Sequence, residues 1–404
     1  MIEKGSNHQM LKQKNSHLIR KFIYQHSPVS RVEIAQELGL TTPTITGMVT
    51  PLLASGLLRE TVAPAEEAKG AGRPRMMLEF VPEAYYCCGV DVGHHQINYI
   101  ITDLLGNVIA TRRTEQSLKG YRETLQAIAD QITDFLGEAD VSREKLLGVG
   151  VCLPGMVDGN ADKIYDIFHE GWREHSFSLE LGELLELKVE VENNVRARVI
   201  CAELFDRIVK AEPFAYFFVS FGVACQMIID GKVLYGQSAA AGEIGHTVVQ
   251  RNGPVCPTCG NRGCLEALTG ERAILQQCRD IMHTDTPTVL RQICPDADLL
   301  TMDQVLAAQE MGDEAVNRVI EDAIEYLGIA LANTINLISP RAVVLEGRIL
   351  SIPKNQERML QVVEQYMFQI HSGITDFEFL PYTPDRGARA AAAVVVKEFL
   401  GRTI

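Results

Sequence analysis

One histidine and three cysteines lie close together in the middle of this 404-residue chain. His246, Cys256, Cys259 and Cys264 fall in one short segment, and the C-x2-C-x4-C spacing lets a Gly-containing turn bring three thiolates around one ion. Imidazole nitrogen and thiolate sulfur bind Zn²⁺ in a tetrahedron, and four protein ligands leave no position for a reacting water. The sequence therefore predicts a structural zinc site, in preference to disulfides, which are rare in a reducing cytosol.

Two carboxylates flank this cluster. Glu243 lies three residues before the histidine, and Glu266 lies two residues after the last cysteine. Folding of the metal loop would also fix both carboxylates, which accept hydrogen bonds and suit the hydroxyl groups of a sugar. Spacing alone leaves open that both are ordinary surface glutamates.

The segments G-E-I-G-H, at residues 242–246, and C-G-N-R-G-C-L-E, at residues 259–266, resemble the zinc and sugar signature of the ROK family. This family contains repressors and sugar kinases. It commonly spaces its first two cysteines C-x-C, whereas this chain has one more residue between Cys256 and Cys259. The resemblance implies that sugar hydroxyls are bound by Asn193, Asn194, Glu243, His246 and Glu266.

ROK kinases use four motifs for phosphoryl transfer, and this chain departs from each. It has Asp91-Val92-Gly93-His94-His95 for D-x-G-G-T, Ser220–Gln226 (SFGVACQ) for G-T-G-x-G-x-G, Glu346-Gly347 for Gly-Gly, and Glu192-Asn193-Asn194 for E-N-D. In the family the last Asp is the catalytic base. Asn194 replaces it, and an amide cannot take up a proton near neutral pH. We therefore expect no ATP cofactor and no enzyme activity.

Length and charge indicate more than one domain. A chain of 404 residues exceeds what one core usually supports, so two or three domains are expected. The net charge is −14, but residues 1–80 carry +3, which leaves −17 on residues 81–404. Only the N-terminal part is therefore suited to nucleic acid. The sequence has no long apolar run and no apolar signal core, which predicts a cytoplasmic protein without a membrane partner.

The first 40 residues predict two helices. Apolar side chains recur at helical spacing over residues 9–26. Ser30, with Glu33 three residues later, forms a capping box that begins the second helix, and Gly39 ends it. A short turn between helices is typical of a helix-turn-helix.

A third helix is expected to follow at once. Thr42 is predicted as its N-cap and Pro43 as its first helical residue, and the helix runs to about Ala54. Pro51 lacks a backbone N–H, so we expect a kink or an early end there. Residues 57–62 and 76–80 then read as two strands of a winged helix.

The third helix and the wing are the predicted DNA-binding elements. Short hydroxyl side chains near a recognition helix N-terminus suit phosphates and base edges, and arginines on an extended wing suit a narrow minor groove. A solvated loop with incidental charge is the alternative for the wing. The predicted DNA contacts are Thr42, Thr44, Thr46, Gly47, Arg73 and Arg75.

The remaining segments alternate strands and helices. Together with the resemblance, they predict an N-terminal winged helix-turn-helix (α+β) followed by a two-lobe α/β actin-like (ribonuclease-H-like) ROK sugar kinase fold. The expected domains are a DNA-binding domain at 1–82, a first lobe at 83–200 with a C-terminal helix at 385–404 packed back on it, and a second lobe at 201–384 with the zinc loop and the oligomerisation surface.

These observations favour a sugar-responsive transcriptional regulator from the repressor branch of the ROK family. We expect it to bind operator DNA as a homodimer or homotetramer, with a sugar or sugar phosphate as effector and Zn²⁺ as structural cofactor. Two alternatives stay open: an active sugar kinase with an added DNA-binding domain, and a regulator controlled by a protein partner.

Overall fold

The structure is a computed structural model. It describes residues 8–62, 75–93, 96–115, 120–158, 163–166, 172, 175–208, 213–237 and 239–401. Its contacts divide the chain into two compact units, which are Met1–Ile208 with Asp385–Ile404, and Val209–Pro384. No helix among the described residues is long and apolar enough to span a membrane.

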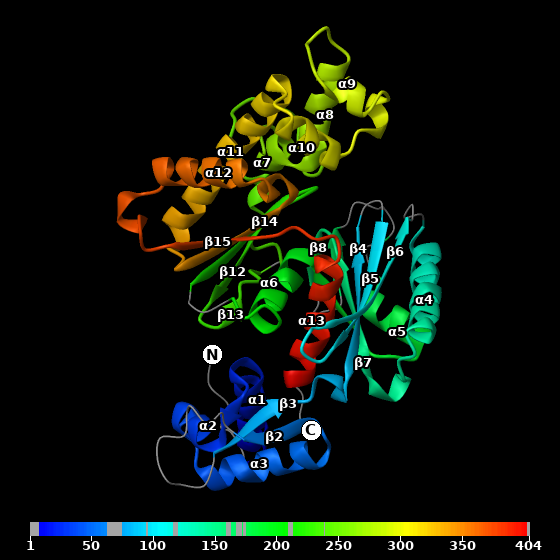
Figure 1. Cartoon of the computed structure of the whole chain (residues 1–404), viewed down its shortest axis with the longest axis vertical. Helices are drawn as coiled ribbons and strands as arrows, with labels where there is room; N and C mark the ends of the chain where they lie inside the picture. The colour runs from blue at the N-terminus through cyan, green and yellow to red at the C-terminus, as the bar shows by residue number, and fades with distance from the viewer. Residues whose placement is uncertain are drawn as a thin grey trace. The chain divides into compact units, whose positions relative to one another are not determined.

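The first unit begins with a winged helix-turn-helix (Figure 1). Its helices are α1 (His8–His26), α2 (Arg31–Leu38) and α3 (Thr42–Ala54). Its antiparallel sheet has the order β1-β3-β2, from β1 (Val29–Ser30), β2 (Leu58–Val62) and β3 (Met76–Phe80). The capping box at Ser30 and the left-handed Gly39 that ends α2 are confirmed, the latter with a φ of 62°. The wing between β2 and β3 lies outside the described residues.

Two details of α3 differ from expectation. Thr41 is the N-cap rather than Thr42, because its hydroxyl accepts a hydrogen bond from the Thr44 amide at 3.4 Å. Two consecutive threonines offer the same chemistry, so the sequence did not distinguish them. The helix also continues through Pro51 to Ala54, so the expected early end is wrong.

The capping box gives a first testable prediction. The Ser30 amide donates to Glu33 Oε2 at 2.8 Å, and this bond and that of the Ser30 side chain lower the pKa of Glu33. Ser30→Ala is expected to lower the stability of α2 by about 1 kcal/mol and so to raise the rate of hydrogen exchange of the α2 amides about fivefold. The pKa of Glu33 is lower in the folded state than in the unfolded state, where it is about 4.3. Its contribution to the free energy of unfolding is therefore fully present above about pH 4.3 and is lost as the pH falls through the folded pKa.

Mass spectrometry of the α2 peptide would measure this exchange. Glu37→Ala is the matched control, since Glu37 is exposed on the same helix. Equal exchange in both variants at neutral pH would contradict the prediction.

The first lobe follows in the same unit and is built on a five-stranded sheet of order β10-β7-β4-β5-β6. Strands β4, β5 and β6 are antiparallel neighbours, while β7 and β10 run parallel to β4. Its strands are β4 (Tyr86–Val92), β5 (Gln96–Asp103), β6 (Val108–Glu115), β7 (Leu146–Leu153) and β10 (Val189–Asn193), with a small pair β8 (Met156–Asp158) and β9 (Lys163–Asp166). Its helices are α4 (Tyr121–Glu138), α5 (Phe177–Leu185), α6 (Asn194–Leu204) and α13 (Arg386–Gly401).

The C-terminal helix α13 packs on this sheet beside α6 (Figure 1). Gly89 and Gly150 face each other on β4 and β7. A Cβ on either would overlap a carbonyl oxygen of α13, at Ala388 and Ala391 respectively. The glycine pair and the Ala-rich helix face therefore allow backbone-to-backbone packing.

Helix α1 packs against the C-terminal end of α13 within the same unit. Arg20 donates to the Phe399 carbonyl at 3.2 Å, and His17 Nδ1 lies 3.0 Å from the Leu400 carbonyl oxygen. Arg20 is buried, and desolvation lowers its pKa. Donors at the last carbonyls of a helix satisfy groups that the helix itself leaves unbonded. The DNA-binding domain is thus attached to the helix that covers the first lobe.

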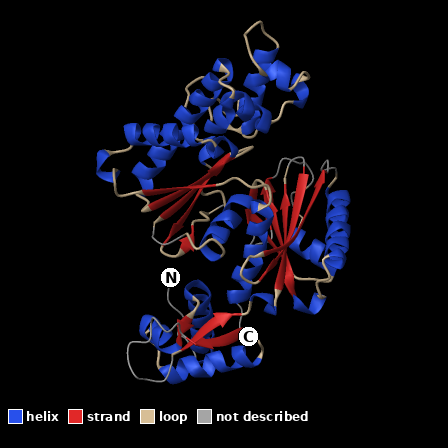
Figure 2. Ribbon diagram, viewed as in Figure 1, coloured by secondary structure: helices blue, strands red, loops and turns tan. Residues whose placement is uncertain are grey.

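The second unit repeats the sheet plan in the order β13-β12-β11-β14-β15. Figure 2 shows the strands in red and the helices in blue. Strands β11, β12 and β13 are antiparallel neighbours, and β14 and β15 run parallel to β11. Its strands are β11 (Phe214–Val219), β12 (Val223–Ile229), β13 (Lys232–Val233), β14 (Ala342–Gly347) and β15 (Asp376–Leu380). Its helices are α7 (Leu265–Thr269), α8 (Glu271–Met282), α9 (Leu290–Ile293), α10 (Met302–Glu310), α11 (Glu314–Ile338) and α12 (Pro353–Tyr366).

Candidate metal centre and sugar site

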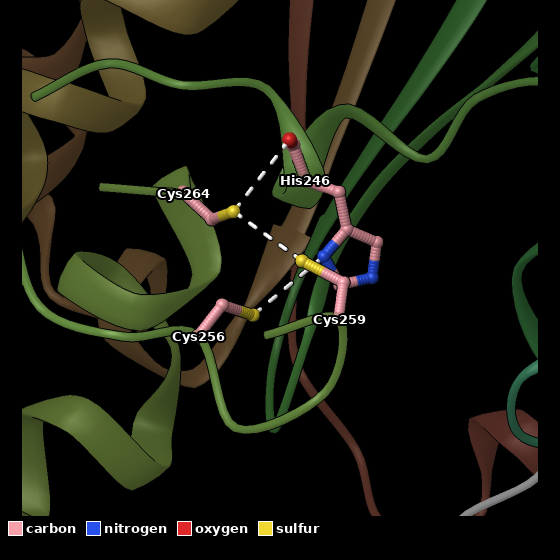
Figure 3. Close-up of side chains that lie close together, drawn as sticks. All are labelled: His246, Cys256, Cys259 and Cys264. Atoms are coloured by element: carbon pink, nitrogen blue, oxygen red, sulfur yellow. Dashed lines mark hydrogen bonds between the residues drawn. The ribbon is translucent and has the colours of Figure 1, made fainter. Parts of the chain in front are cut away.

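The structure brings the four predicted metal ligands together (Figure 3). The ligand atoms of His246, Cys256, Cys259 and Cys264 all lie within 4.8 Å of one another. Cys256 Sγ is 3.7 Å from His246 Nδ1, and Cys259 Sγ is 3.5 Å from Cys264 Sγ. A tetrahedral site with Zn–S bonds of about 2.3 Å has edges of about 3.8 Å, so the cluster fits Zn²⁺ with little movement.

A small hairpin positions three of these ligands. The Cys256 amide donates to the Asn261 carbonyl at 2.7 Å, and the Gly260 amide donates back to the Cys256 carbonyl at 2.9 Å. Gly260 has a φ of +77°, a conformation that glycine adopts without strain. Cys256, whose assignment the longer C-x2-C spacing made less secure, lies with the other ligands.

Neighbouring thiols of this cluster shift each other's pKa. Burial raises the pKa of Cys264, and the neighbouring Cys259 thiol raises it further. Burial acts in the same direction on Cys259, but hydrogen bonds from the Asn261 amide and the neighbouring thiols lower the pKa of Cys259 overall. A thiolate, the form that binds a metal, is therefore favoured at Cys259.

Of the three predicted sugar residues of the second unit, His246 is itself in the metal cluster, and Glu243 and Glu266 lie on the segments that carry His246 and follow Cys264. Glu243 precedes the 3₁₀ turn η4 (Ile244–His246), which carries the histidine and contacts α7. Glu266 lies in α7, and Thr258 Oγ1 donates to its Oε1 at 2.6 Å. Thr258 lies in the extra length between Cys256 and Cys259, so the metal hairpin itself orients the carboxylate.

Sequence reasoning missed two residues of this region. Thr258 was treated only as spacing. Gln226 was named only as the end of the altered G-T-G segment; its side chain is buried, and its amide donates to the Ala241 carbonyl, two residues before Glu243. No sequence pattern links the paired residues, because each contact depends on how the chain folds back on itself.

Asn193 and Asn194 lie in the first unit, at the start of α6. Asn193 is its N-cap: Oδ1 accepts from the Val195 amide at 2.9 Å and from the Arg196 amide at 3.1 Å. Its Nδ2 donates to the Gly155 carbonyl at 2.8 Å. Most of its hydrogen-bonding capacity is therefore used within the fold, whereas Asn194 is the half-buried first residue of the helix.

The predicted DNA contacts of α3 lie mainly on its outer face. Thr42, Thr46 and Gly47 are exposed, while Ile45 and Val49 are buried beneath them. Thr44 is half-buried, and its hydroxyl lies 2.8 Å from that of Thr41. Arg75 is exposed at the start of β3, and Arg73 lies outside the described residues.

Trp172 is a core residue. It is 1 % exposed and packs edge-on against Tyr121, with ring centroids 5.4 Å apart. It also stacks on Phe177 at 5.9 Å. Trp172 therefore packs in the interior of the first lobe.

Comparison with known proteins agrees with this geometry. A family model described as "ROK family" matches residues 87–398. The chain belongs to the ROK family. It is 27% identical over 394 residues to the xylose repressor of Bacillus subtilis (strain 168), covering 96% of this chain and 97% of that one.

Two solved ROK structures share the fold. One is a ROK family transcriptional regulator, a homologue of the Escherichia coli Mlc protein, with a TM-score of 0.81, 23% identity and 97% coverage of both chains. The other is a ROK family glucokinase from Streptomyces griseus in complex with glucose and AMPPNP, with a TM-score of 0.64 and 20% identity. The match covers 98% of the glucokinase but only 76% of this chain.

Two of the altered ROK kinase motifs are joined to each other in the second unit. Ser220 Oγ donates to Glu271 Oε1 at 3.5 Å, and Glu271 lies 3.7 Å from Arg348 Nε. Arg348 also bonds Asp303 Oδ1 at 3.1 Å and the Tyr382 hydroxyl at 3.2 Å. Burial raises the pKa of Glu271, although Arg348 opposes the shift. Side chains thus bridge the segments that correspond to the G-T-G loop and the late Gly-Gly turn.

The other departures in the ROK motifs also have structural roles. Glu346 is fully buried and accepts a hydrogen bond from the Tyr216 hydroxyl, so its carboxylate is engaged in the interior of the second unit. Asp91, which this chain shares with the D-x-G-G-T motif, packs against Gly387 at the start of α13, where a Cβ would overlap it. His94 and His95 lie outside the described residues.

Proposed function

We propose that this ROK protein is a sugar-responsive DNA-binding transcriptional repressor, acting in the cytoplasm on genes of carbohydrate uptake or catabolism. The observation that carries the proposal is a winged helix-turn-helix attached, through α1 and α13, to a ROK lobe whose catalytic base is replaced by Asn194. The relatives with the same full length bear the names of repressors and regulators.

The proposed protein is not an enzyme. Asn194 cannot accept the proton of a sugar hydroxyl, and the Ser220–Glu271–Arg348 bridge occupies segments that a kinase needs for phosphate. The sugar-facing side of the second unit keeps Glu243, His246 and Glu266. Zn²⁺ would be held by His246 and the three cysteines, which leave no open coordination position. Its role would be structural: it would hold the segments that carry these residues in place.

Ligand control requires that the sugar bind one conformation more tightly than the other. In the proposed mechanism, Glu243 and Glu266 accept hydrogen bonds from sugar hydroxyls while His246 lines the site. The sugar-bound conformation has the lower affinity for the operator. The contacts of Arg20 and His17 with α13 are the connection through which the lobe would act on the DNA-binding domain.

We further propose that the protein binds DNA as a symmetric homodimer or homotetramer, since paired half-sites require paired recognition helices. Exposed apolar side chains gather where the end of α11 meets the segment after α12: Leu337 is 83 % exposed and Phe368 is 65 % exposed. The Phe368 amide donates to Asn336 at 2.7 Å, which holds this segment against α11. Apolar clusters of this kind commonly mark protein interfaces, and a second copy is the proposed occupant.

Light scattering after size exclusion tests the assembly. A Leu337→Glu and Phe368→Glu double variant is expected to convert the oligomer to monomer and to lower DNA affinity. Met311→Glu is the matched control, because Met311 is 65 % exposed elsewhere on the second unit. An unchanged mass in the double variant would exclude this surface as the interface.

A thermal-shift screen tests the proposed function itself. The zinc-loaded protein would be screened against free sugars, sugar phosphates and ATP, and a sugar at a hundredfold excess over its Kd stabilises the fold by about 2.7 kcal/mol. Glu243→Gln removes a charged acceptor and is expected to weaken the sugar at least tenfold, while zinc content stays unchanged. A clear shift with ATP, accompanied by ATP consumption in a coupled assay, would contradict the proposal.

A further inference from the structure

A cavity of about 390 Å³ lies beside the metal hairpin in the second unit. This volume is within the range of about 300–1,000 Å³ typical of small-molecule sites. Glu266 lines the cavity, but neither Glu243 nor His246 does. The cavity therefore adjoins the sugar-facing residues at Glu266 without coinciding with them.

The walls of the cavity combine apolar surfaces with planar polar groups. Phe221, Pro254, Pro257 and Leu268 supply the apolar surface. Arg272 and Gln276 lie one turn apart on α8 and supply hydrogen-bond donors, and Glu266 supplies a carboxylate acceptor. A sugar ring presents C–H faces and a rim of hydroxyls, and such a mixture of surfaces suits it.

The metal hairpin fixes the entrance to this cavity. Thr258 lines it and holds Glu266 Oε1 at 2.6 Å, while Oε2 lies on the Gly222 side, 2.8 Å from where a Cβ of that residue would be. Gly222 therefore leaves room for the carboxylate. Glu266 both lines the cavity and lies beside η4, its Cβ being 3.4 Å from where a Cβ of Gly245 would be, so its carboxylate is within reach of two adjoining rings.

The charges of the walls do not favour a nucleotide. Arg272 is the one cation and Glu266 the one carboxylate among the lining residues. Arg272 is exposed, and no ion pair or hydrogen bond joins its guanidinium to another described residue. Phosphates would lie close to the Glu266 carboxylate, whereas neutral hydroxyls can bond both groups.

We propose that this cavity is a second saccharide subsite, so that the effector of the protein is at least a disaccharide. The inference rests on the proposed function, because the first sugar unit is the one held by Glu243 and His246. The second sugar ring packs against Phe221 and forms hydrogen bonds with Arg272 and Gln276. Phe221 stands in the altered G-T-G segment, so a former phosphate loop supplies part of the subsite wall.

Isothermal titration of the full-length, zinc-loaded protein tests the subsite with matched pairs of probes: xylose and xylobiose, glucose and cellobiose, N-acetylglucosamine and chitobiose. The best disaccharide is expected to bind at least tenfold more tightly than its own monosaccharide. An Arg272→Ala and Gln276→Ala double variant is expected to remove this advantage while leaving monosaccharide affinity unchanged. Arg318→Ala, an exposed helical arginine outside the cavity, is the control.

The outcomes separate this inference from the proposed function. A monosaccharide that binds as tightly as its disaccharide, or a sugar phosphate that binds more tightly, would overturn the subsite while leaving a sugar sensor. A disaccharide advantage that survives in the double variant would place the second ring elsewhere and also overturn it. Absence of binding by every saccharide would overturn both proposals.

Discussion

Replacing Cys264 by Ser is expected to remove the bound zinc and to destabilise the second unit. Cys264 is fully buried, its Sγ lies 3.5 Å from that of Cys259, and a hydroxyl is a poor substitute for a thiolate ligand. The hairpin carries Thr258 and leads into α7, so its release also frees Glu266. We expect a loss of about 3 kcal/mol or more, which lowers the Tm of a unit of this size by about 6–12 °C.

Zinc content by elemental analysis and calorimetric unfolding measure the two effects together. Cys294→Ser is the matched control, because Cys294 is also buried in this unit and its Sγ lies 3.0 Å from the Asp296 carbonyl oxygen, to which a serine hydroxyl can donate. The control should retain zinc and lose little stability. A Cys264→Ser protein that retained one zinc per chain would contradict the assignment of this ligand.

The second large effect is expected at Gly150, where α13 meets the first lobe. A Cβ at this position would overlap the Ala391 carbonyl oxygen. Backbone cannot rotate away as a side chain does, so Gly150→Ala is expected to cost about 3 kcal/mol, the upper part of the range for overpacking. Because α13 also receives Arg20 and His17 at its other end, the change is expected to loosen the DNA-binding domain too.

Gly137→Ala provides the contrasting control. Gly137 lies in α4, and nothing lies within 4 Å of where its Cβ would be. Alanine has the higher helix propensity, so this substitution is expected to stabilise by about 0.5–1 kcal/mol. Urea unfolding of both variants tests the pair, and equal stability of the two would show that α13 does not pack closely on the sheet.

The features that sequence predicted are those with local signals. The capping box of Ser30 and Glu33 and the spacing of the zinc ligands each depend on residues close together in the chain. The plan of the two lobes followed from the resemblance to the ROK family, which the family match confirms.

The remaining features depend on side-chain contacts that no sequence pattern marks. Two of these contacts are hydrogen bonds, from Thr258 to Glu266 and from Gln226 to the Ala241 carbonyl. A third joins Ser220 to Arg348 through Glu271. Each forms only in the folded chain. Spacing predicted where Glu266 lies but not which atom orients it. Asn193 was assigned to sugar by the resemblance, but it caps α6 through local hydrogen bonds from the Val195 and Arg196 amides, which use acceptor capacity that a sugar would otherwise take.

The connection between the sugar site and DNA is tested most directly by fluorescence anisotropy. Operator fragments would be selected from genomic DNA with the sugar-free protein, and the complex would then be titrated at fixed salt with the sugar that gives the largest thermal shift, because affinity for DNA depends strongly on salt. The account predicts that saturating sugar raises the Kd for operator at least tenfold in the wild type and leaves it unchanged in Glu243→Gln at the same sugar concentration. An operator Kd that stays constant while the sugar is bound would contradict a sugar-responsive repressor.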